Sequence, residues 1–362
     1  MKNTLSSSAR IPMPARYGIN LALSVLLWGA LVLMMAGGII SNYWQGIMVT
    51  VGINVILAVS LNIATGYLGQ LPLGHAGFMA VGAYAGGLFM KATPLASLIS
   101  SGDTAATVPW IILALLISGL VAAVFGLIIG IPALRLKGDY LAILTLGFGE
   151  IIRVVITNID SVLGFKFTYG AAGLKQIPKI SNFTLVFLCV ALTCLIIHMV
   201  MKSRHGRAIL SIRENEIAAE SCGINITYYK VMAFALSAFF AGIAGCLYAG
   251  YLGSLFPSTF KFMKSIEILV MVVLGGMGSM LGSVLAATVL TVVSELLRSL
   301  GDLRMVFYSL ILVVMMIFRP KGLLGTYDFS VSRILEKAIN IFKSKSSTGQ
   351  EANAESEGGE SK

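Results

Sequence analysis

Charged residues are scarce in this sequence: they make up 12% of its 362 residues, whereas soluble domains carry about 25%. Hydrophobic residues account for 57%, and the mean hydropathy is +0.89. A folded chain of this composition has too little polar surface to stay in water. The scarcity of charge therefore excludes an ordinary soluble domain and makes the lipid bilayer the expected solvent.

Several catalytic and metal-binding motifs are absent. The dipeptide Gly-Lys never occurs, so there is no GxxxxGK[ST] phosphate loop, and neither GxSxG nor HExxH is found. A multi-histidine metal site is not expected, because the chain holds only three histidines: His75, His198 and His205. The cysteines form no CxxC pair and are interpreted as small apolar fillers: Cys189, Cys194, Cys222 and Cys246. We expect no cofactor, no metal and no catalytic residue.

Long apolar runs are what the sequence has in abundance. Backbone groups must be paired inside hydrocarbon, and runs of about 20 residues without strand alternation predict helices. An all-α polytopic membrane protein with about ten membrane helices, some short or broken, is expected at residues 19–40, 44–64, 72–90, 109–134, 139–157, 183–201, 231–253, 266–280, 282–299 and 305–318.

The ends of the chain differ from the predicted transmembrane domain, which covers 19–325. A basic arm (1–18) precedes an apolar run that lacks a small-residue cleavage pattern, so we expect an uncleaved first span. Residues 326–343 show near-helical apolar spacing and predict a helix on the membrane surface. The acidic tail, 344–362, has nothing to bury and is expected to be disordered.

The formal charge of +10 does not indicate nucleic acid, because Lys and Arg cluster at the ends of apolar runs. With a cytoplasmic N-terminus, the groups RLKGD (135–139), KSRHGR (202–207) and RPKG (319–322) all fall inside, and so does the C-terminus. The bias is imperfect, since five lysines would then lie outside: Lys166, Lys175, Lys179, Lys261 and Lys264.

Two apolar runs are interrupted by proline and glycine. Non-helical backbone at membrane depth is tolerated where it is buried in protein or lines a wet cavity. The breaks are therefore candidates for the substrate path, with close helix packing as the alternative: Gly66, Gly69, Pro72, Gly74, His75 and Gly77 in the first, and Gly275, Gly276 and Gly278 in the second. For the GxxxG pairs Gly82–Gly86 and Gly126–Gly130 we favour packing.

Few ionisable residues fall within the apolar runs. Glu150 with Arg153, and Glu295 with Arg298, are spaced to form i,i+3 pairs and are interpreted as structural. Glu267 has no such partner in this interpretation and is a weak functional candidate near an outer end.

A polar insert, Ser211–Ile224 (SIRENEIAAESCGI), stands between two apolar runs inside a predicted loop, 203–229. Small residues suit a helix that seats in a partner's groove, and a glycine permits the turn that ends it. The Ala-Ala-xxx-Gly spacing resembles the EAA coupling loop of ABC importer permeases, although Ile217 stands where that motif expects Glu. The resemblance implies ATPase-coupling residues at Arg213, Glu214, Glu216, Ala218, Ala219 and Gly223.

Longer blocks extend this resemblance over about residues 45–325. They are NIATGYLGQLPLGHAGFMAVGAYAGGL, LRLKGDYLAILTLGFGEIIRVV, SRHGRAILSIRENEIAAESCGINITYYKVMAFALSAFFAGIAGCLYA and EILVMVVLGGMGSMLGSVLAA, with RPKGLLG after the last span. In order, they resemble the branched-chain amino acid permease family of ABC importers, in particular its LivM-type subunit.

The resemblance implies a permease subunit for leucine, isoleucine and valine in a prokaryotic cell membrane. It also implies its partners: a second, LivH-like permease chain, two cytoplasmic ABC ATPases and an extracytoplasmic amino-acid-binding protein. Closely similar permeases carry urea or short amides, which is the main alternative. An ion-coupled secondary transporter would share the broken helices but would not need the charged insert. A membrane enzyme would need a nucleophile, base or metal cluster that the loops lack.

Overall fold

The computed structural model describes residues 40–101, 104–136, 138–164 and 168–300, with a few residues beyond these ranges. The chain divides into two units: Ile40–Tyr327, and Met1–Ile39 together with Asp328–Lys362. In the second unit, the described residues 26 and 28–35 are helical. The predicted arm (1–18), surface helix (326–343) and acidic tail (344–362) lie outside the described residues, as does nearly all of 305–318.

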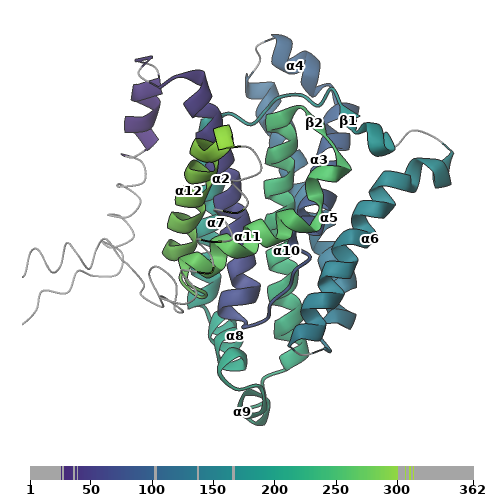
Figure 1. The fold of residues 1–362 in the computed structure, drawn as a ribbon, viewed down its shortest axis with the longest axis vertical. Coiled ribbons are helices and arrows are strands. Elements are labelled where there is room, and N and C mark those ends of the chain that lie inside the picture. The colour runs from purple at the N-terminus through teal and green to yellow at the C-terminus, as the bar shows by residue number, and fades with distance from the viewer. Residues whose placement is uncertain are drawn as a thin grey trace, which may run out of the picture. The chain divides into compact units, whose positions relative to one another are not determined.

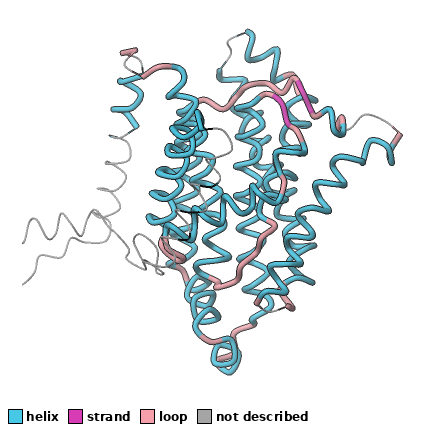
Figure 2. Tube along the Cα trace, in the orientation of Figure 1, coloured by secondary structure: helices cyan, strands magenta, loops and turns pink. Residues whose placement is uncertain are grey.

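Helices dominate the Ile40–Tyr327 unit (Figures 1 and 2). They are α2 (Asn42–Asn62), η1 (Ile63–Tyr67), α3 (His75–Ala92), α4 (Leu95–Ser101), α5 (Thr104–Ala133), α6 (Asp139–Leu163), η2 (Gly170–Ala172), α7 (Phe183–Lys202), α8 (Arg204–Glu214), α9 (Glu216–Ser221), α10 (Ile226–Leu252), η3 (Pro257–Phe260), α11 (Phe262–Gly275), α12 (Met280–Leu296) and η4 (Leu297–Leu300).

The class of a polytopic helical membrane protein is confirmed, and each predicted run from 44–64 to 282–299 coincides with a helix. Among the described residues, however, only five helices are long and apolar enough to span a membrane: α2 with η1, α5, α6, α7 and α10. Helix α11 has 14 residues, or about 21 Å, which is short of the roughly 30 Å hydrocarbon core. The described part of the chain therefore has fewer full crossings than the roughly ten membrane helices that the sequence predicted.

Helix α10 forms the centre of the bundle and packs against α2, α3 and α5. The two GxxxG pairs lie at these contacts, as predicted. A Cβ on Gly82 would lie 2.2 Å from the Cα of Gly242, and one on Gly126 would lie 2.6 Å from the Cβ of Ala238. Small residues thus let α3 and α5 approach α10 closely.

The described residues also form one small sheet, which the all-α prediction did not include. Strand β1 (Leu174–Lys175) pairs antiparallel with β2 (Ser254–Leu255) at the end of the bundle opposite α9 (Figure 1). Two-residue strands carry too little periodicity to be read from sequence.

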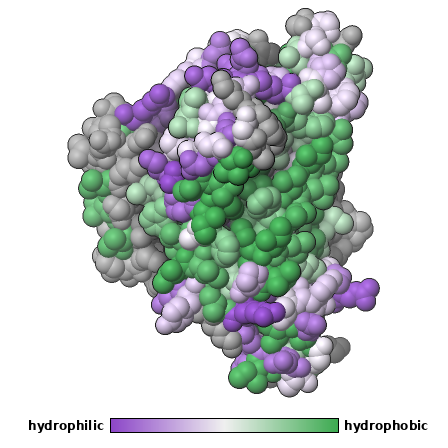
Figure 3. Space-filling view, turned by 90° about the vertical axis from the view of Figure 1, so that its right-hand side faces the viewer, coloured by the Kyte–Doolittle hydropathy of each residue, from purple (hydrophilic) through white to green (hydrophobic). Residues whose placement is uncertain are grey.

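The surface matches a lipid environment. Figure 3 shows apolar residues across the middle of the molecule, with polar residues gathered at both ends. Many large apolar side chains are exposed on α5, α6 and α7, among them Ile128, Ile143 and Leu188. Such a belt is what a hydrocarbon core requires.

Candidate functional site

Helix α8 has a polar N-cap residue, Ser203, and one buried, largely apolar face. The Ser203 Oγ accepts hydrogen bonds from the backbone N–H groups of His205 and Gly206, at 3.2 and 3.4 Å. The buried residues of α8 recur at every third position, at Gly206, Ile209 and Ile212, so one face of this helix packs on the bundle.

Asn215 separates α8 from α9. Its φ of −160° ends α8, and its side-chain oxygen accepts a 3.1 Å hydrogen bond from Ala218 N–H to cap α9. The helix expected in the insert is therefore the short α9, because residues 211–214 belong to the end of α8. Asparagine is a favoured N-cap residue, and that preference was the available signal.

Helix α9 has an inner and an outer face. Ala219 is buried, and Glu216 forms a 2.5 Å ion pair with Lys230 of α10. Glu214, Ala218 and Ile217 are exposed, and Ile217 shows 78% of its surface. The structure thus separates the predicted coupling residues into some that hold the helix and some that a partner can reach.

Gly223 ends α9 in a left-handed conformation, with φ +80°. The Gly223 N–H donates to Glu220 O at 2.9 Å, and the Ile224 N–H donates to Ala219 O at 3.1 Å. These two bonds form a Schellman motif, which favours glycine at this position. The predicted turn at Gly223 is confirmed, whereas docking there stays a prediction.

Arg213, at the end of α8, reaches back into the bundle. Its guanidinium donates a 2.6 Å hydrogen bond to the carbonyl oxygen of Gly66 in η1. A Cβ on Gly69 would lie 3.1 Å from the Arg213 Cγ, and one on Gly278 would lie 2.9 Å from its NH1 nitrogen. One side chain of the insert therefore touches both interrupted runs.

The two interruptions meet at a glycine junction formed by Asn62, Gly66, Gly278 and Ser279. The Asn62 amide accepts from Gly278 N–H at 2.9 Å and donates to Ser279 O at 3.1 Å. A Cβ on Gly66 would lie 2.2 Å from the Gly278 nitrogen. Sequence reasoning named Gly278 but missed Asn62, whose buried polar side chain late in an apolar run was the signal.

The backbone departs from the α-helix in the first interrupted run. Residues 63–67 are a π-helix, a rare form found often at functional sites. The following residues run without helix to α3, and Figure 2 shows this loop rising from the α8 end toward the middle of the bundle. Within it Gly69 and Leu71 are exposed, whereas Pro72 and Gly74 are buried.

Gly74 and Gly77 pack tightly against α6. Their Cβ atoms would lie 2.1 Å from the Thr145 carbonyl oxygen and 2.9 Å from the Gly149 Cα. Thr145 Oγ1 also accepts from Leu73 N–H at 3.0 Å. These glycines serve close packing, and the exposed part of the break lies before them.

His75 begins α3 and is 2% exposed. Its Nε2 lies 2.9 Å from the Ser60 Oγ, so it is a core histidine with a polar partner.

The second interruption is a tight turn. Gly276 and Gly278 have φ values of +103° and +90°, and a Cβ on Gly275 would lie 2.5 Å from the Gly282 carbonyl. The positive φ values and the close contact of α11 with α12 require glycine here.

The charged pairs are local. Arg153 bonds Glu150 at 2.6 Å, and Arg298 bonds Glu295 at 2.9 Å, as predicted. Glu267 was wrongly taken as isolated: Lys264, three residues before it, pairs with it at 3.0 Å. Glu150 also accepts from Phe262 N–H at 2.9 Å and so joins α6 to the start of α11.

Lys230 is another residue of this region that sequence reasoning missed. Its side chain is buried one turn into α10, where its ammonium meets Glu216. A lone cation immediately before the apolar run 231–253 was the signal. Across the described ranges, no group of three or more His, Cys, Asp or Glu residues is arranged to hold a metal ion.

Residues 43–319 match the family described as "Branched-chain amino acid transport system / permease component". The chain is 35% identical over 353 residues to the high-affinity branched-chain amino acid transport system permease protein LivM of Salmonella typhimurium and to that of Escherichia coli, covering 88% of this chain and 79% of each relative. A nucleoside ABC transporter permease protein, NupC of Lactococcus lactis, is 25% identical over 76% of this chain and 89% of its own length.

Proposed function

The chain belongs to the family of branched-chain amino acid transport permease components, and from this premise we propose that it imports leucine, isoleucine and valine. It is a non-catalytic, multi-pass membrane subunit, and ATP is hydrolysed on separate cytoplasmic ATPases. A LivH-like second permease and an extracytoplasmic binding protein complete the transporter. The pairing of Glu150, Glu267 and Glu295 with nearby cations supports a zwitterionic cargo, because each of these described acids is already neutralised by a cation of this chain.

The observation that carries the mechanism is the Arg213 hydrogen bond to Gly66. ATPase closure moves α8 and α9, which present the exposed Ile217 and Ala218 to the partner. Arg213 passes that motion to the glycine junction, where both interrupted runs meet. A shift there changes the non-helical backbone that we propose lines the path, and the pore turns from outward to inward facing.

Reconstitution tests the substrate. The complete transporter in proteoliposomes should take up labelled leucine only with ATP and binding protein, and isoleucine and valine should compete. Uptake of urea or of a nucleoside without leucine would move the chain to a sister substrate group. Uptake that follows a proton or sodium gradient without ATP would favour a secondary transporter.

A further inference from the structure

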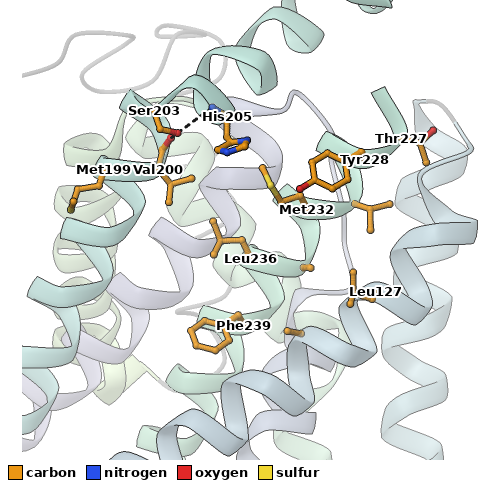
Figure 4. A pocket seen from close by; sticks show the side chains of 13 residues that line it. Leu127, Met199, Val200, Ser203, His205, Thr227, Tyr228, Met232, Leu236 and Phe239 are labelled. Carbon is orange, nitrogen blue, oxygen red and sulfur yellow. Dashed lines mark hydrogen bonds between the residues drawn. The ribbon is translucent and has the colours of Figure 1, made fainter. Parts of the chain in front are cut away.

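An apolar groove of about 950 Å³ opens on the side of the bundle among α5, α7 and α10 (Figure 4). Aliphatic and aromatic side chains line most of it, including Leu127, Met232, Leu236 and Phe239. Its volume falls in the range of ligand sites, about 300–1,000 Å³. Neither Arg213 nor any residue of the glycine junction lines this groove.

The groove is polar at one end only. Ser203, His205, Thr227 and Tyr228 lie at the end near α8, and Figure 4 shows Leu236 and Phe239 further along α10. The exposed cations Lys202 and Arg204 flank Ser203 in the sequence. An occupant would therefore present an anionic group at the α8 end and a hydrocarbon body along the groove.

The length of the groove decides between a lipid and a protein helix. Thr227 and Phe239 both line it and are twelve residues apart on α10, which is about 18 Å along a helix. That is close to half of the roughly 30 Å hydrocarbon core, the depth of one leaflet. A spanning helix of a partner would need a groove about twice as long.

We propose that this groove binds an anionic phospholipid of the inner leaflet. One acyl chain lies along Met232, Leu236 and Phe239, and the phosphate lies near Lys202, Arg204 and His205. Basic pockets between membrane helices on the cytoplasmic side suit such headgroups. Because α7, α8 and α10 all contribute, a bound lipid would steady the base of the coupling helices. The inference rests on the proposed orientation but not on the transported substrate.

Lipid retention in the assembled transporter tests the proposal. The complex is loaded into nanodiscs of phosphatidylcholine with one fifth phosphatidylglycerol, transferred to mild detergent, and its lipids are measured by mass spectrometry. We expect phosphatidylglycerol to be enriched at least several-fold over the starting mixture. The double variant Lys202→Ala/Arg204→Ala should lose that enrichment, and Ala235→Trp, which fills the groove, should lose the lipid itself.

Matched controls separate the groove from the general surface. Leu188→Trp introduces the same indole side chain at an exposed position of α7 outside the groove. Lys175→Ala removes a cation at the opposite end of the bundle. Both should retain the lipid as the wild type does. The proposal is overturned if Ala235→Trp and the wild type retain equal lipid, or if phosphatidylglycerol is not enriched. Capture of the second permease chain by a photo-crosslinker at Met232 would also overturn it.

Discussion

At the scale of single residues, Arg213 joins regions that are 147 positions apart in the sequence. The NH1 nitrogen that donates to the Gly66 carbonyl would also lie 2.9 Å from a Cβ on Gly278. A hydrogen bond from a charged group contributes about 1.5–3 kcal/mol when it is intact. Because the side chain is exposed overall, the lower end of that range applies.

We expect Arg213→Ala to uncouple transport. ATP hydrolysis by the assembled complex should persist, whereas uptake per ATP should fall about tenfold, the effect of losing roughly 1.4 kcal/mol. Arg213→Lys should be intermediate, because an ammonium lacks the fork of donors. Arg207→Ala, on the same helix and bonded to Lys202 O, is the control and should transport normally. Equal uptake per ATP in Arg213→Ala and wild type would remove Arg213 from the route.

The Lys230–Glu216 pair gives a second prediction. Glu216→Ala leaves a buried ammonium without this carboxylate, and breaking a buried pair costs about 3–5 kcal/mol. Because Glu216 is about one quarter exposed, we expect about 2–3 kcal/mol. The double variant Glu216→Ala/Lys230→Met should recover most of that loss, since it also removes the buried charge.

Thermal denaturation of the purified complex measures this pair. The Glu214→Ala variant, at an exposed neighbouring position, should match the wild type. Additive effects of the two substitutions would show that the pair does not hold α9. The pair also means that Glu216 is a poor site for a cross-linking cysteine, and Ile217 is the better one.

At the scale of elements, Gly223 fixes the direction in which the chain leaves α9. A Cβ there would meet nothing within 4 Å, so only the φ of +80° opposes substitution. The strain is about 1–2 kcal/mol for most residues, and less for asparagine.

We therefore expect Gly223→Asn to keep uptake, Gly223→Val to lower it several-fold, and Gly223→Arg to abolish it by adding bulk and charge at the docking face. A cysteine at Ile217 should cross-link to the ATPase in the asparagine variant and not in the arginine variant. Wild-type uptake by Gly223→Arg would contradict the assignment of α9 as the helix that docks on the ATPase.

The first break offers an element-level test of the path. Gly74→Leu would strike the Thr145 carbonyl, so it tests packing rather than the path. Leu71 is 44% exposed in the same connection, whereas Leu68 is 1% exposed. In a Cys222→Ser background, Leu71→Cys should react with a small charged thiol reagent, and Leu68→Cys should not.

Substrate should slow the Leu71→Cys reaction if the break lines the path. A cysteine at Leu71 that stays unreactive in the assembled, functional transporter would mean that this segment faces lipid or protein.

Sequence reasoning located the helices well because apolar length is a strong local signal. It located the breaks at Pro72–Gly77 and Gly275–Gly278 because proline and glycine mark interrupted helices. It did not show that Asn62 and Gly66 meet Gly278, because the Asn62–Gly278 hydrogen bond joins positions 216 residues apart. It also assigned six residues of the insert to a partner surface, since nothing local shows that the side chains of Glu216 and Arg213 bond to the bundle.

At the scale of the whole molecule, charge and fold agree on orientation. The α5–α6 and α7–α8 connections, which hold RLKGD and KSRHGR, lie at the α8–α9 end of the bundle (Figure 1). The predicted outer lysines Lys175 and Lys179 belong to the connection that pairs with β2 at the other end. The positive-inside rule therefore predicts that the α8–α9 end lies in the cytoplasm.

The native cysteines allow a direct test of that orientation. Cys222, at the end of α9, is exposed, whereas Cys246 is buried and Cys189 and Cys194 lie within α7. A membrane-impermeant maleimide should therefore label Cys222 in inside-out vesicles and not in intact spheroplasts. Lys175→Cys in a Cys222→Ser background should show the reverse pattern, because residue 175 is exposed at the far end. Added ATPase subunits should protect Cys222, since its helix is the proposed docking element. Labelling of Cys222 from outside intact spheroplasts would invert the bundle, and no ATP-driven motion in the cytoplasm could then reach Arg213 through α8 and α9.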